Sequence, residues 1–150
     1  MHCLDVAQMS FILLKTGPDC LAVQLELSHV EQLAVIMACV CHDFAHDGFN
    51  NGYHVANETA RFLAHGSTGV QEKFHFAEAF KLLEQHQIIA SMGSMQKLAF
   101  KLRMQQSIFS TDMARHMSDL NALKEMTEGL QAGAPIIPTD LPYEEKESRR

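Results

Sequence analysis

The chain has 150 residues, the size of one domain, and 47% of them are hydrophobic, which is enough to bury a core. The net charge is −6 and the 12 basic residues are scattered, so nucleic acid is not an expected partner. The longest apolar run, residues 33–41, is far shorter than the roughly 20 residues that cross a bilayer. We therefore expect a soluble, cytoplasmic protein with no membrane segment in this chain and with four reduced cysteines.

The apolar pattern predicts helices and no strands. No segment alternates polar and apolar residues for long enough to indicate a strand, so the expected fold class is all-α. A short helix is predicted over residues 2–14, and residues 20–27 form a connector or a further helical turn. Ser28, followed three residues later by Glu31, is a capping-box pattern that predicts the start of a central helix at about His29.

Three more helices are predicted downstream. A short one covers residues 53–64, and a second covers residues 70–85 and should pack on the central helix. Its expected buried stripe consists of Phe74, Ala77, Phe80 and Leu83. A third, long helix is predicted from residue 95 to about residue 128. Methionines on this part of the chain are expected to pack in the core: Met92, Met95, Met104, Met113, Met117 and Met126.

The composition changes near residue 131. Residues 1–130 are expected to form one domain, whereas the segment beyond it contains three prolines and ends in a run of charges. Residues 131–150 are therefore predicted to be a flexible tail or connector.

The central helix ends in a histidine and an aspartate, His42 and Asp43, which we expect it to deliver to its C-terminal end inside the protein. Burying such groups is unfavourable unless they are paired or bind a metal, and they are ligands for zinc, manganese or magnesium. A third ligand must come from another helix. His2 is the candidate, with Asp5 placed on the same helical face to orient its ring. Three protein ligands leave positions open for water, so the expected chemistry is metal-assisted hydrolysis.

Five segments, in order along the chain, resemble motifs of the class I cyclic nucleotide phosphodiesterases, which are members of the wider HD-domain hydrolases. HDFAHDGFNN at residues 42–51 is similar to HDxDHPGxxN. The other four are HCLDVAQ at residues 2–8, which resembles the second half of HNxxHAxDVxQ; VQEKFH at 70–75, which resembles VLENHH; FKLL at 80–83, which is similar to FxLL; and TDMARHM at 111–117, which resembles TDMxxHM. The resemblance implies a compact, multi-helix phosphodiesterase fold that is incomplete at both ends.

The resemblance also implies site residues and a reaction. The three candidate ligands named above would bind a first metal, usually zinc, and Asp43 would bridge to a second, usually magnesium or manganese. His46, Glu72 and Thr111 match positions that hold the water shell of the second metal. The implied reaction is attack of hydroxide on the phosphorus of cAMP or cGMP, which opens the 3′ ester to a 5′-monophosphate in signal transduction.

The sequence departs from the motifs in ways that bear on activity. The substitutions are Ala45 for the second aspartate of HDxDH, Asp47 for the proline, and Lys73 and Phe74 for the asparagine and histidine of ENHH. The histidine that serves as general acid would lie before the first residue, and residues 129–150 match neither the ADLSNP segment nor the purine-binding glutamine and phenylalanine. We therefore expect a fragment with weak or no activity alone, because general-acid catalysis is worth about 10² to 10⁴ in rate.

Alternatives remain for the function and for each residue. The chain could be a non-catalytic helical binding module, or an HD-type phosphohydrolase that acts on another nucleotide. Thr111 could bond a backbone carbonyl in its own helix, and the other candidates could be capping or solvated residues. The sequence does not specify cAMP against cGMP, regulatory domains or oligomeric state.

Overall fold

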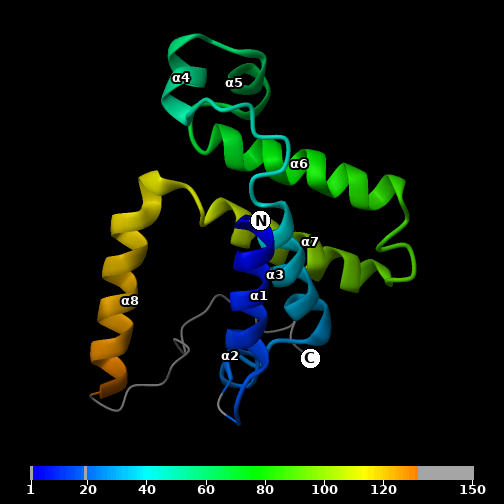
Figure 1. The fold of residues 1–150 in the computed structure, drawn as a ribbon, viewed down its shortest axis with the longest axis vertical. Coiled ribbons are helices and arrows are strands. Elements are labelled where there is room, and N and C mark those ends of the chain that lie inside the picture. Colours follow the sequence, from blue (N-terminus) through cyan, green and yellow to red (C-terminus); the bar gives the residue numbers. More distant parts are fainter. Residues whose placement is uncertain (1, 19, 132–150) are drawn as a thin grey trace.

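The computed structural model describes residues 2–18 and 20–131, and all the regular structure in them is helical, as predicted. Figure 1 shows the helices packed around a central region, with one helix standing apart from the others. In chain order the elements are α1 (His2–Lys15), α2 (Leu21–Gln24), α3 (His29–Cys41), α4 (Asn51–Ala56), α5 (Ala60–His65), α6 (Val70–Gln85), α7 (Ser94–Phe109), the 3₁₀ helix η1 (Met113–Arg115) and α8 (His116–Gln131).

The hydrophobic core lies where α3, α6 and α7 meet. Helix α7 is the main neighbour of α3, and α1 packs on another side of α3, next to it in Figure 1. The predicted packing of residues 70–85 on the central helix is present, but α6 packs more extensively on α7. The buried side chains of this core are Ala34, Ala38, Phe76, Ala79, Phe80, Leu83, Ile89, Phe100, Met104 and Ile108.

Helix α3 begins where the sequence predicts. The Ser28 hydroxyl accepts a hydrogen bond from the backbone N–H of Glu31 at 3.2 Å, and the Ser28 N–H donates to the Glu31 carboxylate at 3.0 Å. The two bonds satisfy donors that would otherwise be unpaired at the start of the helix. The helix ends at Cys41, so that His42 is its C-terminal capping residue.

The buried face of α3 is narrower than its apolar sequence suggested. Ala34 and Ala38 are buried, whereas Leu33 and Val40 are 44% and 40% exposed. Alanine leaves room for a neighbouring helix to approach, and large side chains from α6 and α7 fill the space instead. The apolar run therefore marks a helix whose fully buried residues are its two alanines, Ala34 and Ala38.

Two predicted helices are each divided in the structure. The helix predicted over residues 53–64 is divided into α4 and α5, and the Thr59 side chain caps α5 by accepting from the Phe62 N–H at 3.4 Å. The long helix predicted to residue 128 is interrupted after Phe109. There the Asp112 carboxylate accepts from the Ala114 N–H at 3.0 Å and starts η1. Hydroxyl and carboxylate side chains compete with helical hydrogen bonds at both breaks.

The stripe predicted for α6 is wrong at its N-terminal end. Beyond Val70 in the first turn, the buried apolar positions are Phe76, Ala79, Phe80 and Leu83, which follow the i, i+3, i+4, i+7 spacing of a helix face. Steps of three residues drift by about 60° each on a helix of 3.6 residues per turn, so the predicted Phe74 lies on another face. The core prediction for the methionines is also only partly correct. Met104 is fully buried, but Met95, Met113, Met117 and Met126 are exposed.

None of the helices in the described part of the chain is long and apolar enough to cross a membrane. The predicted tail, apart from Gln131 at the end of α8, lies outside the described residues, so the domain boundary near residue 131 stays a prediction.

Candidate metal centre

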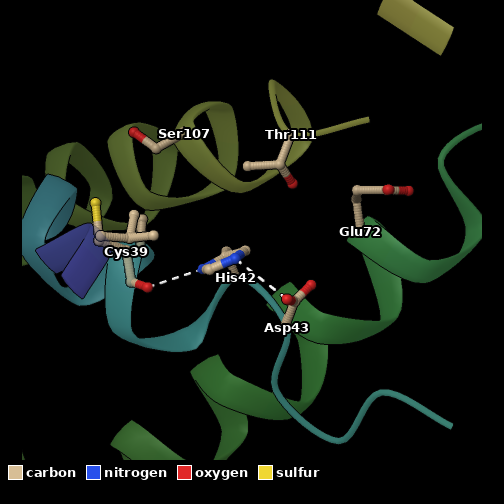
Figure 2. A pocket seen from close by; sticks show the side chains of 8 residues that line it. Cys39, His42, Asp43, Glu72, Ser107 and Thr111 are labelled. Atoms are coloured by element: carbon tan, nitrogen blue, oxygen red, sulfur yellow. Dashed lines mark hydrogen bonds and ion pairs between the residues drawn. The ribbon is translucent and has the colours of Figure 1, made fainter. Parts of the chain in front are cut away.

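His42 is held at the C-terminal end of α3 by the backbone of its own helix. Its Nδ1 lies 2.8 Å from the carbonyl oxygen of Cys39, to which it donates a hydrogen bond. This bond leaves Nε2 as the nitrogen with a lone pair, and Nε2 lies 3.2 Å from the Asp43 carboxylate (Figure 2). A carbonyl behind the imidazole is a usual means of fixing the tautomer and orientation of a metal-binding histidine.

His2 completes a group of three possible ligands. Because α1 packs on α3, the ring of His2 meets that of His42 edge to face, with centroids 5.2 Å apart. One ligand atom from each of His2, His42 and Asp43 lies within 4.8 Å of the other two. Zinc bonds of about 2.0–2.2 Å put tetrahedral ligands about 3.4 Å apart, so small side-chain rotations would bring the three into range. The donor set therefore fits a divalent cation.

Two expectations about these ligands need correction. The His42 side chain is only 11% exposed, but that of Asp43 is 47% exposed, so the pair lies at the edge of the protein and not inside it. Asp5 is exposed, and in the described residues it makes no hydrogen bond to His2. The contact that orients a candidate ligand in the structure is the hydrogen bond from His42 to the Cys39 carbonyl. The sequence could not indicate it, because a backbone carbonyl is present at every residue.

A cavity of about 380 Å³ opens beside two of the candidate ligands, His42 and Asp43. Figure 2 shows His42 and Asp43 on one side of it, with Glu72 and Thr111 projecting from α6 and from the end of α7. The residues that line it are Val6, Ala38, Cys39, His42, Asp43, Glu72, Ser107 and Thr111. Four predicted site residues therefore share one cavity. Cys39 and Ser107 were not predicted to belong to it.

Glu72 is oriented by a side chain from another element. The side-chain Nδ2 of Asn51 donates to the Glu72 carboxylate at 2.9 Å, and the side-chain Oδ1 of Asn51 accepts from the backbone N–H of Gln71 at 2.8 Å. Asn51 thus connects the loop that follows the histidine–aspartate pair to the first turn of α6. The sequence carried a signal for it, because Asn51 is the last residue of the HDFAHDGFNN run.

Thr111 makes the local hydrogen bond considered for it and also lines the cavity. Its hydroxyl donates to the Ile108 carbonyl at 2.7 Å, which is the local bond expected of a threonine near a helix end. The same oxygen keeps lone pairs that can accept a hydrogen bond from water in the cavity.

His46 differs from the other candidates because the cavity lining does not include it. Its ring stacks on His75, with centroids 5.4 Å apart, and its Nδ1 accepts from the Gly48 N–H at 2.9 Å. His75 is 2% exposed and donates to the Phe44 carbonyl at 2.7 Å. Burial lowers the pKa of His75 by more than the Phe44 bond raises it, so this imidazole is neutral near pH 7.

Cys41, the residue before His42, is a poor competitor for a cation. All four cysteines are free thiols. Burial, and then the nearby Cys3, raise the pKa of the Cys41 thiol above its ordinary value of 9.0. Since the thiolate is the form that binds metals, a raised pKa favours nitrogen and oxygen ligands here.

Comparison with known proteins gives a consistent match. A family model described as 3′5′-cyclic nucleotide phosphodiesterase matches residues 1–149. The chain is 34% identical over 130 residues to mouse 3′,5′-cyclic-AMP phosphodiesterase 4C, covering 85% of this chain and 18% of that protein. It is 32% identical over 127 residues to the dual 3′,5′-cyclic-AMP and -GMP phosphodiesterase 11A of Takifugu rubripes, covering 83% and 14%. It is 30% identical over 129 residues to the cGMP-specific 3′,5′-cyclic phosphodiesterase of Drosophila virilis, covering 85% and 14%.

The chain thus spans less than a fifth of the length of each of these relatives. The match nevertheless includes every candidate site residue, from His2 to Thr111. The chain belongs to the 3′,5′-cyclic nucleotide phosphodiesterase family.

Proposed function

We propose that this chain forms the metal-binding part of a site that hydrolyses 3′,5′-cyclic nucleotides to 5′-monophosphates, in signal transduction. The observation that carries the proposal is the convergence of His2, His42 and Asp43 beside a cavity that also contains Glu72 and Thr111. The substrate class follows from the relatives, whose names specify cAMP, cGMP or both. They do not favour one nucleotide for this chain.

The proposed site holds two divalent cations. His2, His42 and Asp43 would hold the first, for which zinc suits the nitrogen and oxygen donors. Asp43 would also contact the second, magnesium or manganese, whose waters would be held by Glu72, Thr111 and His46. When bound, such cations neutralise phosphate oxygens and lower the pKa of water, which supplies the nucleophile.

The protein's own contribution is to orient the groups around the cavity. The Cys39 carbonyl fixes His42 with Nε2 toward Asp43, and Asn51 fixes the Glu72 carboxylate. Groups fixed before a substrate binds need no reorganisation during the reaction, and this makes their electrostatic effect large. His46 lies outside the cavity lining, so its proposed role would act through a water.

We propose weak or no turnover by the 150-residue chain itself. The one histidine among the described residues that line the cavity is His42, which the proposal assigns to the metal, and general-acid help from a further histidine is worth about 10² to 10⁴ in rate. We also propose a cytoplasmic location, because its cysteines are free thiols, which are usual in a reducing compartment.

Zinc binding tests the proposal directly. The purified chain should bind about one Zn²⁺ in a competition titration with a chelating dye, and His42→Ala should weaken binding by at least about 100-fold because it removes the oriented ligand. His29→Ala is the matched control, since His29 lies at the opposite end of the same helix. No zinc binding by the unmodified chain would favour a non-catalytic binding module.

An activity assay tests the substrate class. The chain, supplied with zinc plus magnesium, should hydrolyse cAMP or cGMP slowly, and Asp43→Asn should remove that activity. Rapid turnover would contradict the proposed need for a further proton donor. Hydrolysis of another nucleotide, with none of the cyclic ones, would favour a different phosphohydrolase.

A further inference from the structure

The loop between α3 and α4 has an unusual backbone conformation next to the candidate ligand Asp43. The Phe44 N–H donates to the Cys41 carbonyl at 2.9 Å and the His46 N–H donates to the Asp43 carbonyl at 3.2 Å, so the chain turns twice in a few residues. Ala45, at the centre of the second turn, has φ of 58°, in the left-handed region. A residue other than glycine adopts this conformation only when its surroundings hold it there.

Arg61 of α5 supplies one such restraint. Its Nη2 donates to the Ala45 carbonyl at 2.9 Å, and its Nε lies 3.4 Å from the Asp47 carboxylate. Its Nη1 donates to the side-chain oxygen of Gln71, and the guanidinium carbon lies 3.7 Å from the centroid of the Phe74 ring. The side chain is only 17% exposed. A planar guanidinium can make several directed contacts at once, which an ammonium group cannot do.

Gln71 restrains the same loop from α6. Its amide nitrogen donates to the Asp47 carboxylate at 2.8 Å and to the Phe49 carbonyl at 2.6 Å. Gln71 is 3% exposed, so these bonds are shielded from water. Asp47, Arg61 and Gln71, called here the Arg61 cluster, therefore contact each other and the backbone of the loop on both sides of His46.

Two members of the Arg61 cluster stand where the motifs quoted above have apolar residues. Asp47 occupies the proline position of HDxDHPGxxN, and Gln71 occupies the leucine position of VLENHH. The two polar replacements hydrogen-bond to each other. A buried polar side chain is unfavourable without a partner, and Asp47 supplies one for the buried Gln71.

We propose that the Arg61 cluster is a positioning device for the candidate metal centre. By holding the Ala45 peptide, Arg61 fixes the turn that begins at Asp43, and hence the direction of the Asp43 carboxylate relative to His42. This inference rests on the proposed function, because it assigns a role in binding the same metal. None of the three residues belongs to the group of candidate ligands or to the cavity lining.

The test is a zinc titration of the full chain carrying Arg61→Ala or Arg61→Lys. Outer residues that orient metal ligands change affinity by about 10- to 100-fold, so Arg61→Ala should bind Zn²⁺ about tenfold more weakly. Arg61→Lys keeps the charge but loses the directed contacts, and should give most of the same loss. Arg115→Ala, which removes an exposed arginine paired with Asp119, is the matched control and should bind like the unmodified chain.

A second arm separates positioning from general destabilisation. In an Asp43→Asn chain, Arg61→Ala should cause no further loss of zinc affinity, because the cluster acts through that carboxylate. Hydrogen–deuterium exchange without metal should become faster in residues 42–51 of Arg61→Ala, while α7 exchanges at its usual rate.

The outcomes distinguish this inference from the proposed function. If the unmodified chain binds no zinc, the proposed function fails and the positioning role fails with it. If the unmodified chain binds zinc and Arg61→Ala binds it equally well, only the positioning role is wrong. If Arg61→Ala weakens zinc binding in the Asp43→Asn chain as much as it does in the unmodified chain, the positioning role is also wrong.

Discussion

Helices α7 and α8 are adjacent in the chain and both have 16 residues, but only α7 belongs to the core. Phe100, Met104 and Ile108 of α7 are at most 1% exposed, whereas Met117 and Leu123 of α8 are 63% and 57% exposed. Helix α7 is covered by α3 and α6, while in the described residues α8 contacts chiefly η1 and stands apart in Figure 1. Apolar residues at helical spacing indicate a face that can be buried, but they do not tell whether a neighbour covers it.

The ion pairs of α7 and of the start of α8 also differ in burial. Arg103 of α7 reaches across to Glu31 at 2.8 Å, and their side chains are 27% and 16% exposed. Arg115, just before α8, lies 3.6 Å from Asp119 one turn later in the chain, and both side chains are largely exposed. The first pair joins distant parts of the sequence and the second is local, so the two should contribute differently to stability.

The largest difference should come from an aromatic side chain of α7. Phe100→Ala should lower the free energy of unfolding by about 3–5 kcal/mol, because it leaves a cavity at the centre of the core. Urea denaturation followed by circular dichroism at 222 nm would measure this change. A loss below about 1 kcal/mol would mean that α7 is not the buried helix.

The two arginines provide a matched test of the ion pairs. Arg103→Ala should lower the free energy of unfolding by about 2 kcal/mol, because it leaves the Glu31 carboxylate partly buried without its charged partner. Arg115→Ala should change it by less than about 0.5 kcal/mol, as is usual for an exposed pair. Equal losses in the two variants would contradict the distinction between the segments.

The Arg103–Glu31 contact also predicts a response to acid. Burial raises the pKa of Glu31, but hydrogen bonds from Arg103 and Ser28, with the charge of Arg103, together lower it below its ordinary value of 4.5. A carboxyl whose pKa is lowered by folding stabilises the protein above 4.5, and this stability is lost as the pH falls from 4.5 through the folded-state pKa. Denaturation at a series of pH values should show a shallower loss in Arg103→Ala over that window.

The smallest effect is expected in α8. Met117→Ala should change the free energy of unfolding of the chain by less than about 0.5 kcal/mol, since the side chain is 63% exposed and little packing is removed. The same denaturation assay, run beside Met104→Ala, compares the same change of residue on the two helices. Equal destabilisation by both substitutions would indicate that the exposed methionine is covered in solution.

Local signals predicted much of this fold. The start of α3 follows from Ser28 and Glu31, and the limits of α6 follow from its apolar spacing, because both depend on residues close in sequence. The break after Phe109 was missed although Ser110, Thr111 and Asp112 marked it. The burial of Met104 beside the exposure of Met117 could not be predicted, because burial depends on which distant helix packs there.

The candidate metal centre was also predicted only in part. Residue types and motifs were sufficient to select His2, His42 and Asp43, which the structure brings together, and Glu72 and Thr111, which share the cavity with two of them. The orientation of Glu72 depends on a hydrogen bond from Asn51, which the motif contained. The orientation of His42 depends on the Cys39 carbonyl, which no pattern of side chains reveals. The contacts of Arg61 were not foreseen either, because they join three segments by side-chain geometry alone.

The central claim is that nitrogen and oxygen atoms of His2, His42 and Asp43 bind a metal. X-ray absorption spectroscopy of the zinc-loaded chain tests it most directly, because zinc lies about 2.0–2.2 Å from nitrogen and oxygen ligands but about 2.3 Å from sulfur. Our account predicts a first shell of nitrogen and oxygen only, with the scattering pattern of two imidazoles, and loss of one imidazole in His42→Ala. A sulfur shell from the nearby Cys39 or Cys41, or a spectrum that His42→Ala leaves unchanged, would contradict it.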